Sequence, residues 1–541
     1  MKSETSVLRD FTVDNRVWLL SGVAIGIGVC ATGLAVILLR LIAISTNLFY
    51  YHRLSAEQVS PAGSGLGYWM VLIPVLGGLL VGFMARFGSD KIRGHGIPEA
   101  IEAILLHRAK VQPKIALLKP LSAAIAIGSG GPFGAEGPII MTGGAFGSLV
   151  AQWMHVTDAE RTTLLVAGAA AGMSATFATP VAAILLAVEL LLFEWRPRSL
   201  VPVAIASATA GILRVHWLGA GPLFHMPEMP WLASGESLLF AAGALAFGAV
   251  MGLVAALLSR MMYAFEDLFE HLHVHWMWWP AIGGIGIGIG GLFFPRGLGV
   301  GYDNIADLLS GSATMQLIIG ILIAKSLMWA FSLGSGTSGG VLAPLLMIGG
   351  AAGALTAHFA GAAPDAQALW ALLGMAAMLS GSLGVPLTAI LFSLEVTHCL
   401  SALLPLTIAC VASYLTTSLL MPRSILTEKL SRRGYHLSRE YGVDPLELVI
   451  IRDLMECCAD GAVPPELPAN FIYADGTARN AAEIMSSEGL ASLPVFDRET
   501  RRLCGYLSVH DLLRARARSI ERESERLRLF SYVPPELGGH N

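Results

Sequence analysis

The 541-residue chain is poor in charge. Lys, Arg, Asp and Glu make up 14% of it, whereas soluble domains carry about 25%. Apolar residues make up 54%, and the mean hydropathy is +0.64. This composition excludes an ordinary soluble protein and predicts a membrane protein. The net charge of −4 is too small to indicate a nucleic-acid partner, and we expect none.

Patterns that carry enzyme chemistry are also scarce. The six cysteines lack the spacing of a metal site, so we interpret them as free thiols. The chain has no recognisable nucleophile–base pair, metal-ligand cluster or phosphate-binding loop with its lysine. These absences argue against an enzyme, and we expect neither a metal nor an organic cofactor.

Long apolar runs are abundant between residues 17 and 420. The clear long segments are 17–39, 67–84, 200–213, 238–258, 276–294, 317–333 and 403–420. Since the first is too long for a signal-peptide core and no small-residue cleavage site follows, it predicts the first membrane helix. The segments between them run to roughly 10–16 residues before Gly or Pro interrupts, which predicts half-spanning or steeply tilted helices.

Glu136 stands out because it lies in such an interruption, 128–138, with apolar sequence on both sides. Seven of these eleven residues are Gly or Pro, which break helices. A carboxylate at membrane depth costs about 2.5–3.5 kcal/mol, and broken helices persist there only where they line a cavity or are buried in protein. Glu136 is therefore a candidate for an ion path rather than an exposed loop acid.

The apolar region contains an internal repeat. Equivalent residues lie 206 positions apart without a gap, which composition alone does not explain. The equivalent pairs include Lys119/Lys325, Pro138/Pro344, Pro180/Pro386 and Glu189/Glu395. The repeats cover about 17–218 and 237–420. Duplicated membrane domains with matched broken segments are typical of transporters whose sites form between half-helix ends.

Three Gly-rich motifs in the apolar region each precede a predicted helix. They are GHGIP at 94–98, GAEGP at 134–138 and GVLAP at 340–344. A helix N-terminus presents unpaired N–H groups and the positive end of the dipole, which favours anions. A cation site would need clustered carboxylates or carbonyl rings, and the core has few acids. The residues therefore favour an anion path.

From about residue 421 the chain becomes soluble in character. A basic stretch, 422–433, follows the last apolar segment and predicts a cytoplasmic C-terminus. Beyond it, 471–473, 493–497 and 503–508 read as strands, and 478–485 and 509–515 as helices, the second of which can extend to residue 529.

Together the three motifs resemble those of the CLC family of chloride channels and chloride/proton exchangers, over about residues 17–430. The segment 299–304 resembles the second-half counterpart of the first motif. The resemblance implies an all-α polytopic membrane domain of CLC-type inverted repeats, a homodimer in lipid, and one chloride path per subunit. The tail resembles a single CBS motif at about 448–517, a small α/β unit whose partner motif dimerisation could supply.

The resemblance also implies roles for individual residues. Glu136 matches the gating glutamate, whose carboxylate occupies an anion's place and leaves on protonation. The amides of Ala135 and Gly137 would face the outer anion site, and those of Val341 and Leu342 the central site. His95 and Gly96 belong to the motif that borders the central site.

Four departures from the family pattern affect the expected mechanism. His95 replaces a serine, Leu342 replaces a phenylalanine, and Leu426 aligns with the tyrosine that closes the inner side of the site. Leu190 stands where exchangers have a second proton-relay glutamate, and Glu194, one helical turn on, is a weak substitute. These departures favour a channel-like mechanism with weak or absent proton coupling. The alternative is a chloride/proton antiporter with a non-standard internal route.

Other interpretations remain open. His95 could equally be a helix-start residue bonded to backbone, and we favour structural roles for Glu189, Glu395, Lys119 and Lys325. The tail could sense a ligand above a silent membrane scaffold. For the CBS-like segment we favour a structural role over binding adenine nucleotide, for which Ser508 and Asp511 would be the phosphate and ribose contacts.

The predicted organisation is a cytoplasmic segment 1–16, a transmembrane domain 17–430 and a cytoplasmic tail 431–541. We predict a multi-pass protein of the cell's inner or plasma membrane with both termini in the cytoplasm, passing chloride and, in the exchanger alternative, protons.

Overall fold

The computed structural model describes residues 15–233, 238–432, 434, 446, 449–457, 464 and 467–528. It forms two compact units, Met1–Arg439 and Glu440–Asn541. The predicted N-terminal segment 1–16 lies almost wholly outside the described residues, as does much of the stretch after residue 432.

The regular elements described in the first unit are helices. The first repeat comprises α1 (Arg16–Tyr51), α2 (Leu72–Phe87), α3 (Ile97–Leu106), α4 (Pro113–Gly128), α5 (Glu136–Trp153), α6 (Asp158–Phe177), α7 (Pro180–Leu186) and α8 (Pro197–Leu218). The short helix α9 (Pro230–Ala233) lies between the repeats. The second repeat comprises α10 (Leu238–Glu270), α11 (Trp279–Phe293), α12 (Tyr302–Leu309), α13 (Met315–Gly320), α14 (Ser326–Gly334), α15 (Leu342–Phe359), α16 (Pro364–Leu383), α17 (Pro386–Thr397) and α18 (Leu403–Leu420). A short helix, α19 (Glu428–Arg432), follows.

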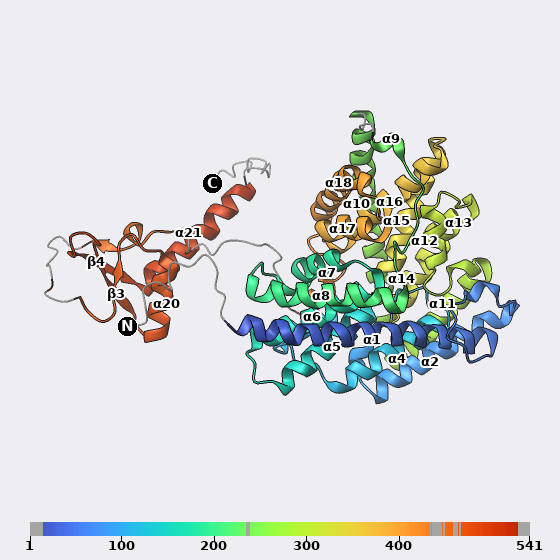
Figure 1. Ribbon diagram of the computed structural model, residues 1–541, viewed down its shortest axis with the longest axis horizontal. Coiled ribbons are helices and arrows are strands. Elements are labelled where there is room, and N and C mark those ends of the chain that lie inside the picture. Colours follow the sequence, from blue (N-terminus) through green and yellow to red (C-terminus); the bar gives the residue numbers. More distant parts are fainter. Residues whose placement is uncertain are drawn as a thin grey trace, which may run out of the picture. The chain divides into compact units, whose positions relative to one another are not determined.

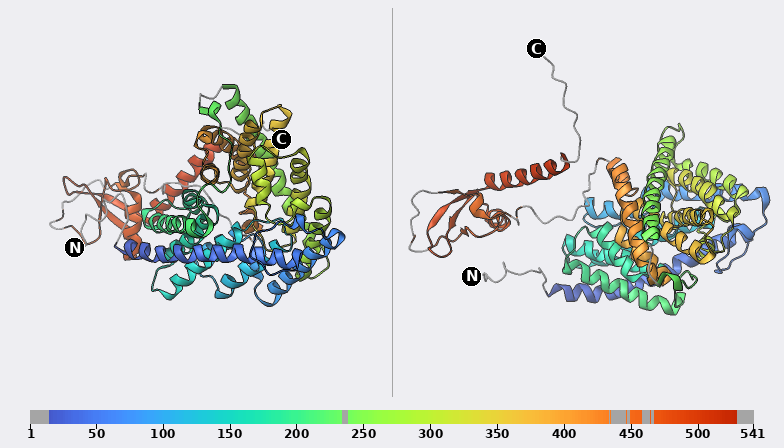
Figure 2. Two further views of the ribbon diagram at one scale, coloured as in Figure 1. Left: turned by 45° about the vertical axis from the view of Figure 1, so that its right-hand side comes forward. Right: turned by 90° about the horizontal axis from the view of Figure 1, so that it is seen from above.

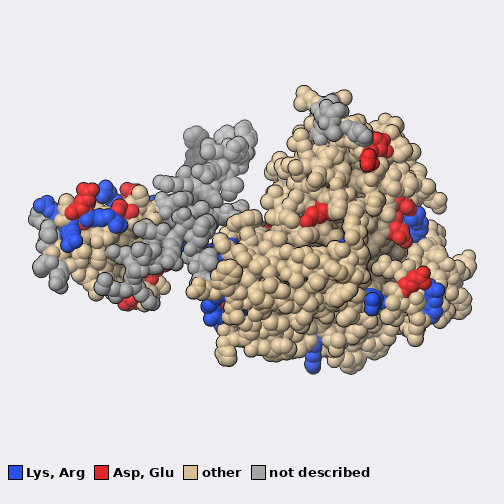
Figure 3. All heavy atoms as spheres, in the orientation of Figure 1, with Lys and Arg blue, Asp and Glu red and all other residues tan. Residues whose placement is uncertain are grey.

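Within the described residues, nine helices are long and apolar enough to cross a membrane. The two repeats lie side by side, with α1 running along one side of the unit (Figures 1 and 2). Few charged side chains are visible on the face of this unit shown in Figure 3. The unit is therefore an integral multi-pass membrane domain, and the predicted fold class is confirmed.

One expectation about the shorter segments was wrong. Four of the helices between the long runs, α5, α6, α15 and α16, have 18 or 20 residues instead of roughly 10–16. Their glycines do not break these helices, because the absence of a side chain at each glycine lets a neighbouring helix pack closely against it. A Cβ on Gly143 would overlap the backbone of Gly168, and a Cβ on Gly349 would overlap that of Gly374. The glycines allow close helix packing, which outweighs their poor helix propensity.

The repeat that the sequence predicts is present in the packing. Helices α5, α6 and α7 begin at 136, 158 and 180, and α15, α16 and α17 begin 206 residues later in each case. The close glycine contacts between α5 and α6 recur between α15 and α16 at the same offset. The duplication therefore extends from sequence to helix bounds and contacts.

Helices α7 and α17 cap one another through carboxylates. Glu395 of α17 accepts hydrogen bonds from the amides of Val181 (2.9 Å) and Ala182 (2.8 Å) in the first turn of α7. Glu189, in the π-helical turn Ala187–Leu192 that extends α7, accepts from the amide of Leu387 at 3.1 Å and from Thr388. Both helices begin with Pro and lack side-chain caps of their own. Each glutamate thus accepts hydrogen bonds from first-turn N–H groups of the other helix, which have no acceptor within their own helix.

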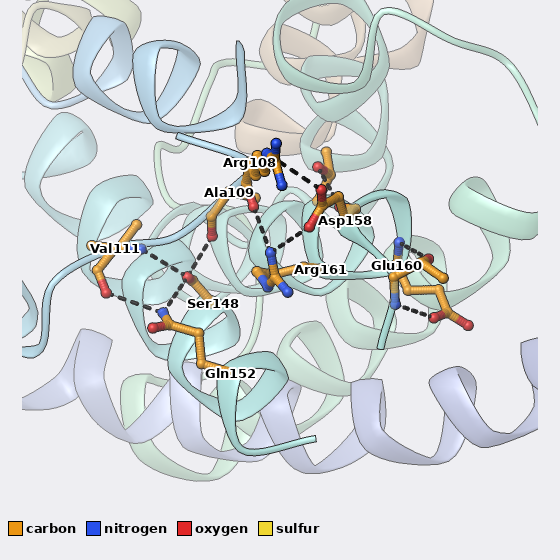
Figure 4. A network of polar contacts seen from close by, with 10 residues as sticks. Arg108, Ala109, Val111, Ser148, Gln152, Asp158, Glu160 and Arg161 are labelled. Atoms are coloured by element: carbon orange, nitrogen blue, oxygen red, sulfur yellow. Dashed lines mark hydrogen bonds and ion pairs between the residues drawn. The ribbon is translucent and has the colours of Figure 1, made fainter. Parts of the chain in front are cut away.

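The turn between α3 and α4 is held by α5 and α6 (Figure 4). The Ser148 hydroxyl donates to the carbonyl of Ala109 at 2.6 Å and accepts from the amide of Val111. Arg161 donates to the carbonyl of Arg108 at 3.0 Å and pairs with Asp158. These contacts fix the C-terminal end of α3, whose N-terminal end carries the first Gly-rich motif.

The tail unit has the predicted strand and helix order. It comprises β1 (Glu456–Cys457), β2 (Ile472–Tyr473), α20 (Ala478–Glu488), β3 (Ser492–Phe496), β4 (Leu503–Ser508) and α21 (Val509–Arg528). The sheet order is β1-β4-β3-β2, with β2 and β3 parallel. A separate apolar cluster, which includes Ile472, Leu493 and Leu507, gives this unit its own core. The short strand β1 was not predicted.

We predict that Glu395→Ala lowers the free energy of unfolding by about 1–2 kcal/mol, because the amides of Val181 and Ala182 lose their acceptor. Thermal unfolding of the purified protein in detergent measures this. The matched control is Glu57→Ala, whose carboxylate forms an exposed pair with Arg53 at 3.3 Å and should change stability by a few tenths of a kcal/mol. Equal stability of both variants would refute the cap.

Candidate functional site

A reciprocal backbone pair joins the second and third Gly-rich motifs. The amide of Gly134 donates to the carbonyl of Gly340 at 3.2 Å, and the amide of Gly340 donates to the carbonyl of Gly134 at 2.9 Å. These two glycines are equivalent in the repeat. Equivalent points of the two repeats are therefore bonded to one another, and helices α5 and α15 each begin two residues beyond this pair.

The first motif is fastened to the same place. The amide of Gly94 donates to the carbonyl of Thr337 at 3.1 Å, and the amide of Gly339 donates back to Gly94 at 3.4 Å. The fully buried ammonium of Lys119 donates to the carbonyls of Ile92 and Gly94, both at 2.8 Å. This lysine supports the loop, in agreement with the structural role favoured from the sequence.

The start of α3 lies directly against the start of α5. Gly96 has a φ of +92°, and a Cβ there would lie 2.8 Å from the carbonyl carbon of Gly137. A Cβ on Gly137 would overlap the carbonyl of His95. Only glycine permits both the backbone angle and the approach. The N-termini of α3, α5 and α15 therefore meet, and the positive ends of three helix dipoles share one buried region.

Glu136 is the carboxylate at this meeting point. Its side chain is fully buried, and neither carboxylate oxygen has a hydrogen bond of regular geometry within the described chain. The carboxylate lies near the amide of Ala343 in the first turn of α15, and it is within electrostatic reach of Lys325. One oxygen would lie 2.8 Å from a Cβ on Gly340. Glu136 belongs to the first repeat, but its carboxylate lies against helix ends of the second.

The structure brings most of the predicted site residues together. Ala135, Val341 and Leu342 are fully buried beside the paired glycines. His95 is 3% exposed, and its Nδ1 is buried with no hydrogen-bond partner in the described chain. The buried Nδ1 is thus available to a bound group rather than held by backbone.

Leu190 and Glu194 are in different surroundings. Leu190 is fully buried in the π-helical turn that packs against α3. The side chain of Glu194 is 29% exposed, forms ion pairs with Arg196 (3.4 Å) and Arg198 (3.7 Å), and accepts from Ser199. The negative charge of Glu194 is thus balanced by these two arginines.

Leu426 is fully buried just before α19. The neighbouring carbonyl of Ile425 accepts a hydrogen bond from the hydroxyl of Tyr263 at 2.6 Å. This places an aromatic hydroxyl next to Leu426 that the sequence did not indicate, but the hydroxyl is bonded to backbone.

In the tail, Ser508 and Asp511 bind one another. Asp511 accepts from the amide of Ser508 at 2.9 Å and from its hydroxyl at 2.6 Å, which forms the cap of α21. Burial alone would raise the pKa of Asp511, but the hydrogen bonds from Ser508 hold that pKa below its usual value. Both predicted nucleotide contacts thus have a structural use.

Sequence reasoning missed two contacts at the first motif. Glu99 accepts from the amide of Gly96 at 2.7 Å and from Lys429 of α19 at 2.8 Å. Both side chains line a charged cavity of about 550 Å³ that also reaches Arg93 and Glu266. Lys429 lies 330 positions from Glu99, so no local pattern indicates the pair.

Comparison with known proteins identifies both units. The family model described as voltage gated chloride channel matches residues 77–418, and the CBS domain model matches 465–518. Chloride channel protein CLC-e of Arabidopsis thaliana is 31% identical over 383 residues, covering 64% of this chain and 52% of the plant protein. The H(+)/Cl(-) exchange transporter ClcA of Vibrio parahaemolyticus is 29% identical over 395 residues, covering 69% and 82%.

Solved structures share the fold. A slow cyanobacterial Cl⁻/H⁺ antiporter aligns with a TM-score of 0.66 at 22% identity, covering 78% of this chain and 99% of the antiporter. A eukaryotic CLC transporter aligns with a TM-score of 0.61 at 17% identity, covering 92% and 98%.

We predict that Gly96→Ala reduces anion flux about tenfold or more, because the methyl group would separate α3 from α5 and the positive φ would be strained. Flux from liposomes that contain the purified protein measures this. The control is Gly219→Ala, at a φ of +94° but with no described atom within 4 Å of the added methyl. It carries the backbone strain alone and should keep its flux. An equal loss in both variants would refute the importance of the close approach.

Proposed function

Because this chain belongs to the voltage-gated chloride channel (CLC) family, we propose that it passes chloride along a path gated by protonation of Glu136. The observation that carries the proposal is the Glu136 carboxylate itself. It is buried at converging helix N-termini, where an anion is favoured, and lacks a regular hydrogen bond in the described chain. The carboxylate thus stands in for the anion, and neutralising it would free the position.

We propose channel-like transport with weak or absent proton coupling. A buried leucine, Leu190, stands where an internal proton acceptor is expected. The acids nearest to it along the chain have other partners: Glu189 accepts hydrogen bonds from the first turn of α17, and Glu194 is paired with two arginines. The exchanger alternative keeps support from relatives that are named exchange transporters. In that case His95, with its unpaired Nδ1, and the acids of the charged cavity are the candidates for an internal proton route.

The anion contacts follow from the same geometry. The amides of Ala135 and Gly137 would face an outer site and those of Val341 and Leu342 a central one, with Ala343 added to the first set by its position beside Glu136. Leu426 would leave the inner side without a free aromatic hydroxyl. We further propose a homodimer in the cell membrane with both termini cytoplasmic, and a structural role for the CBS unit.

We predict that Glu136→Gln removes the pH dependence of chloride flux while flux stays high, because the neutral amide imitates the protonated gate. Chloride release from liposomes, measured over the pH range in which carboxyl groups titrate, is the test. Glu57→Gln, an exposed acid of the same type, should keep the pH dependence of the unmodified protein. Unaltered pH dependence in Glu136→Gln would overturn the assignment of the gate.

We also predict that a chloride gradient drives no proton movement when the membrane voltage is clamped with a potassium ionophore. The physical reason is that a proton on Glu136 has no second acceptor at Leu190. A pH electrode outside the liposomes detects proton uptake directly. Uptake against the proton gradient at a fixed ratio to chloride would establish an exchanger and refute the channel-like mechanism.

A further inference from the structure

Tyr302 carries another buried polar group near the site. The hydroxyl of Tyr302 is buried, has no hydrogen-bond partner in the described chain, and is within electrostatic reach of the Glu136 carboxylate. A buried hydroxyl without a partner is destabilising, and a poorly bonded buried carboxylate is more so. Two such groups within electrostatic reach of one another are unusual, because buried polar groups in proteins are nearly always paired.

The ring of Tyr302 is held by aromatic side chains from other parts of the domain. Phe177 packs edge-on at 6.4 Å between ring centroids, Phe224 lies at 6.2 Å, and Phe392 packs against Phe177 at 5.5 Å. These contacts fix the direction of the phenol, so its hydroxyl is a stationary target. Glu136 has a shorter side chain whose bonds can rotate, and it is the partner that would move.

The loop before Tyr302 is anchored by the second buried lysine. Lys325 donates to the carbonyls of Gly299 (3.1 Å) and Val300 (3.3 Å), as Lys119 does in the first repeat. Lys325 is within electrostatic reach of Glu136, which in turn is within electrostatic reach of Tyr302. One lysine therefore places Tyr302 and faces the carboxylate that Tyr302 would bind.

The hydroxyl is specific to one repeat. Ile97 begins α3 after its Gly-x-Gly turn, and Tyr302 begins α12 after the equivalent turn. The carboxylate of Glu136 lies toward the second repeat, on the side where the hydroxyl is present. Part of the Tyr302 ring also borders a cavity of about 130 Å³ lined by Ser60 and Pro61, which is large enough for several water molecules.

We infer that Tyr302 receives the Glu136 carboxyl group when it leaves the helix ends. The protonated carboxyl donates its O–H to the phenol oxygen, so each group gains a hydrogen bond in the open state. This inference rests on the proposed gate and assigns the place to which the gate moves. Tyr302 is thus a positioning residue for the open gate.

The test is Tyr302→Phe, which removes only the hydroxyl. Since the lost hydrogen bond favours the protonated carboxyl, the pH of half-maximal chloride flux should fall by about half to one unit. At a fixed pH near the midpoint, flux should fall about 2- to 10-fold. Tyr506→Phe, in strand β4 of the tail unit and 47% exposed, removes a hydroxyl elsewhere and should leave the midpoint in place. An unchanged or higher midpoint in Tyr302→Phe would overturn the inference.

The same substitution in a Glu136→Ala background shows whether Tyr302 acts through the gate. With no carboxyl to receive, Tyr302→Phe should change flux less than twofold. If Tyr302→Phe lowers the flux as much in this background as in the protein that retains Glu136, the hydroxyl serves the path or the fold instead. If Glu136→Ala by itself keeps the original pH dependence, the proposed gate is wrong. If Glu136→Ala loses the pH dependence but Tyr302→Phe has the same midpoint as the unmodified protein, only the assignment of Tyr302 is wrong.

Discussion

The reciprocal backbone pair between Gly134 and Gly340 is the contact on which the site depends. Its two hydrogen bonds join equivalent points of the two repeats. Because α5 and α15 begin two residues beyond these glycines, the pair sets the distance between their N-termini. The further bonds from Gly94 to the segment 337–339 bring α3 to the same point. Positive helix ends would repel one another in a low dielectric, so covalent continuity and these backbone bonds must hold them together.

The scaffold is nearly symmetric, whereas the chemistry is not. Buried lysines, paired glycine contacts and exchanged carboxylate caps recur in both repeats. The differences lie at the helix starts, where Glu136 is opposed by Leu342, and Tyr302 by Ile97. A symmetric framework thus supplies the helix ends. The residues that differ between the repeats place one acid, Glu136, and one hydroxyl, that of Tyr302, near the helix starts of the second repeat. In the mechanism that we propose, this single acid would control the path.

Much of this arrangement could be predicted from the sequence, because duplication and helix starts leave local patterns. The offset between the repeats predicted that Glu189 and Glu395 are equivalent. In the structure, each of these glutamates caps the start of the helix to which the other belongs. The lengths of α5, α6, α15 and α16 were misjudged, since propensity treats glycine as a break and cannot register the close packing of Gly143 on Gly168. The pair of Glu99 with Lys429 and the approach of Tyr302 to Glu136 depend on residues far apart in sequence. A sequence pattern within one helix or strand cannot predict such contacts, although the Gly-x-Gly turn before Tyr302 can be recognised in the sequence.

The energetics of Glu136 explain why a poorly satisfied acid suits a gate. A buried carboxylate with full hydrogen bonding is stable in one place and leaves it slowly. Here the charge is balanced by the helix ends, the nearby Ala343 amide and Lys325, without a regular hydrogen bond in the described chain. A chloride ion can compete for the same amides, and a proton can remove the charge altogether. Strict exchange additionally requires that the proton have a second resting place on the far side of the anion. In the channel-like mechanism that we propose, the buried Leu190 offers no such place, so protonation of Glu136 would act as a switch on the anion path rather than as one half of a coupled cycle.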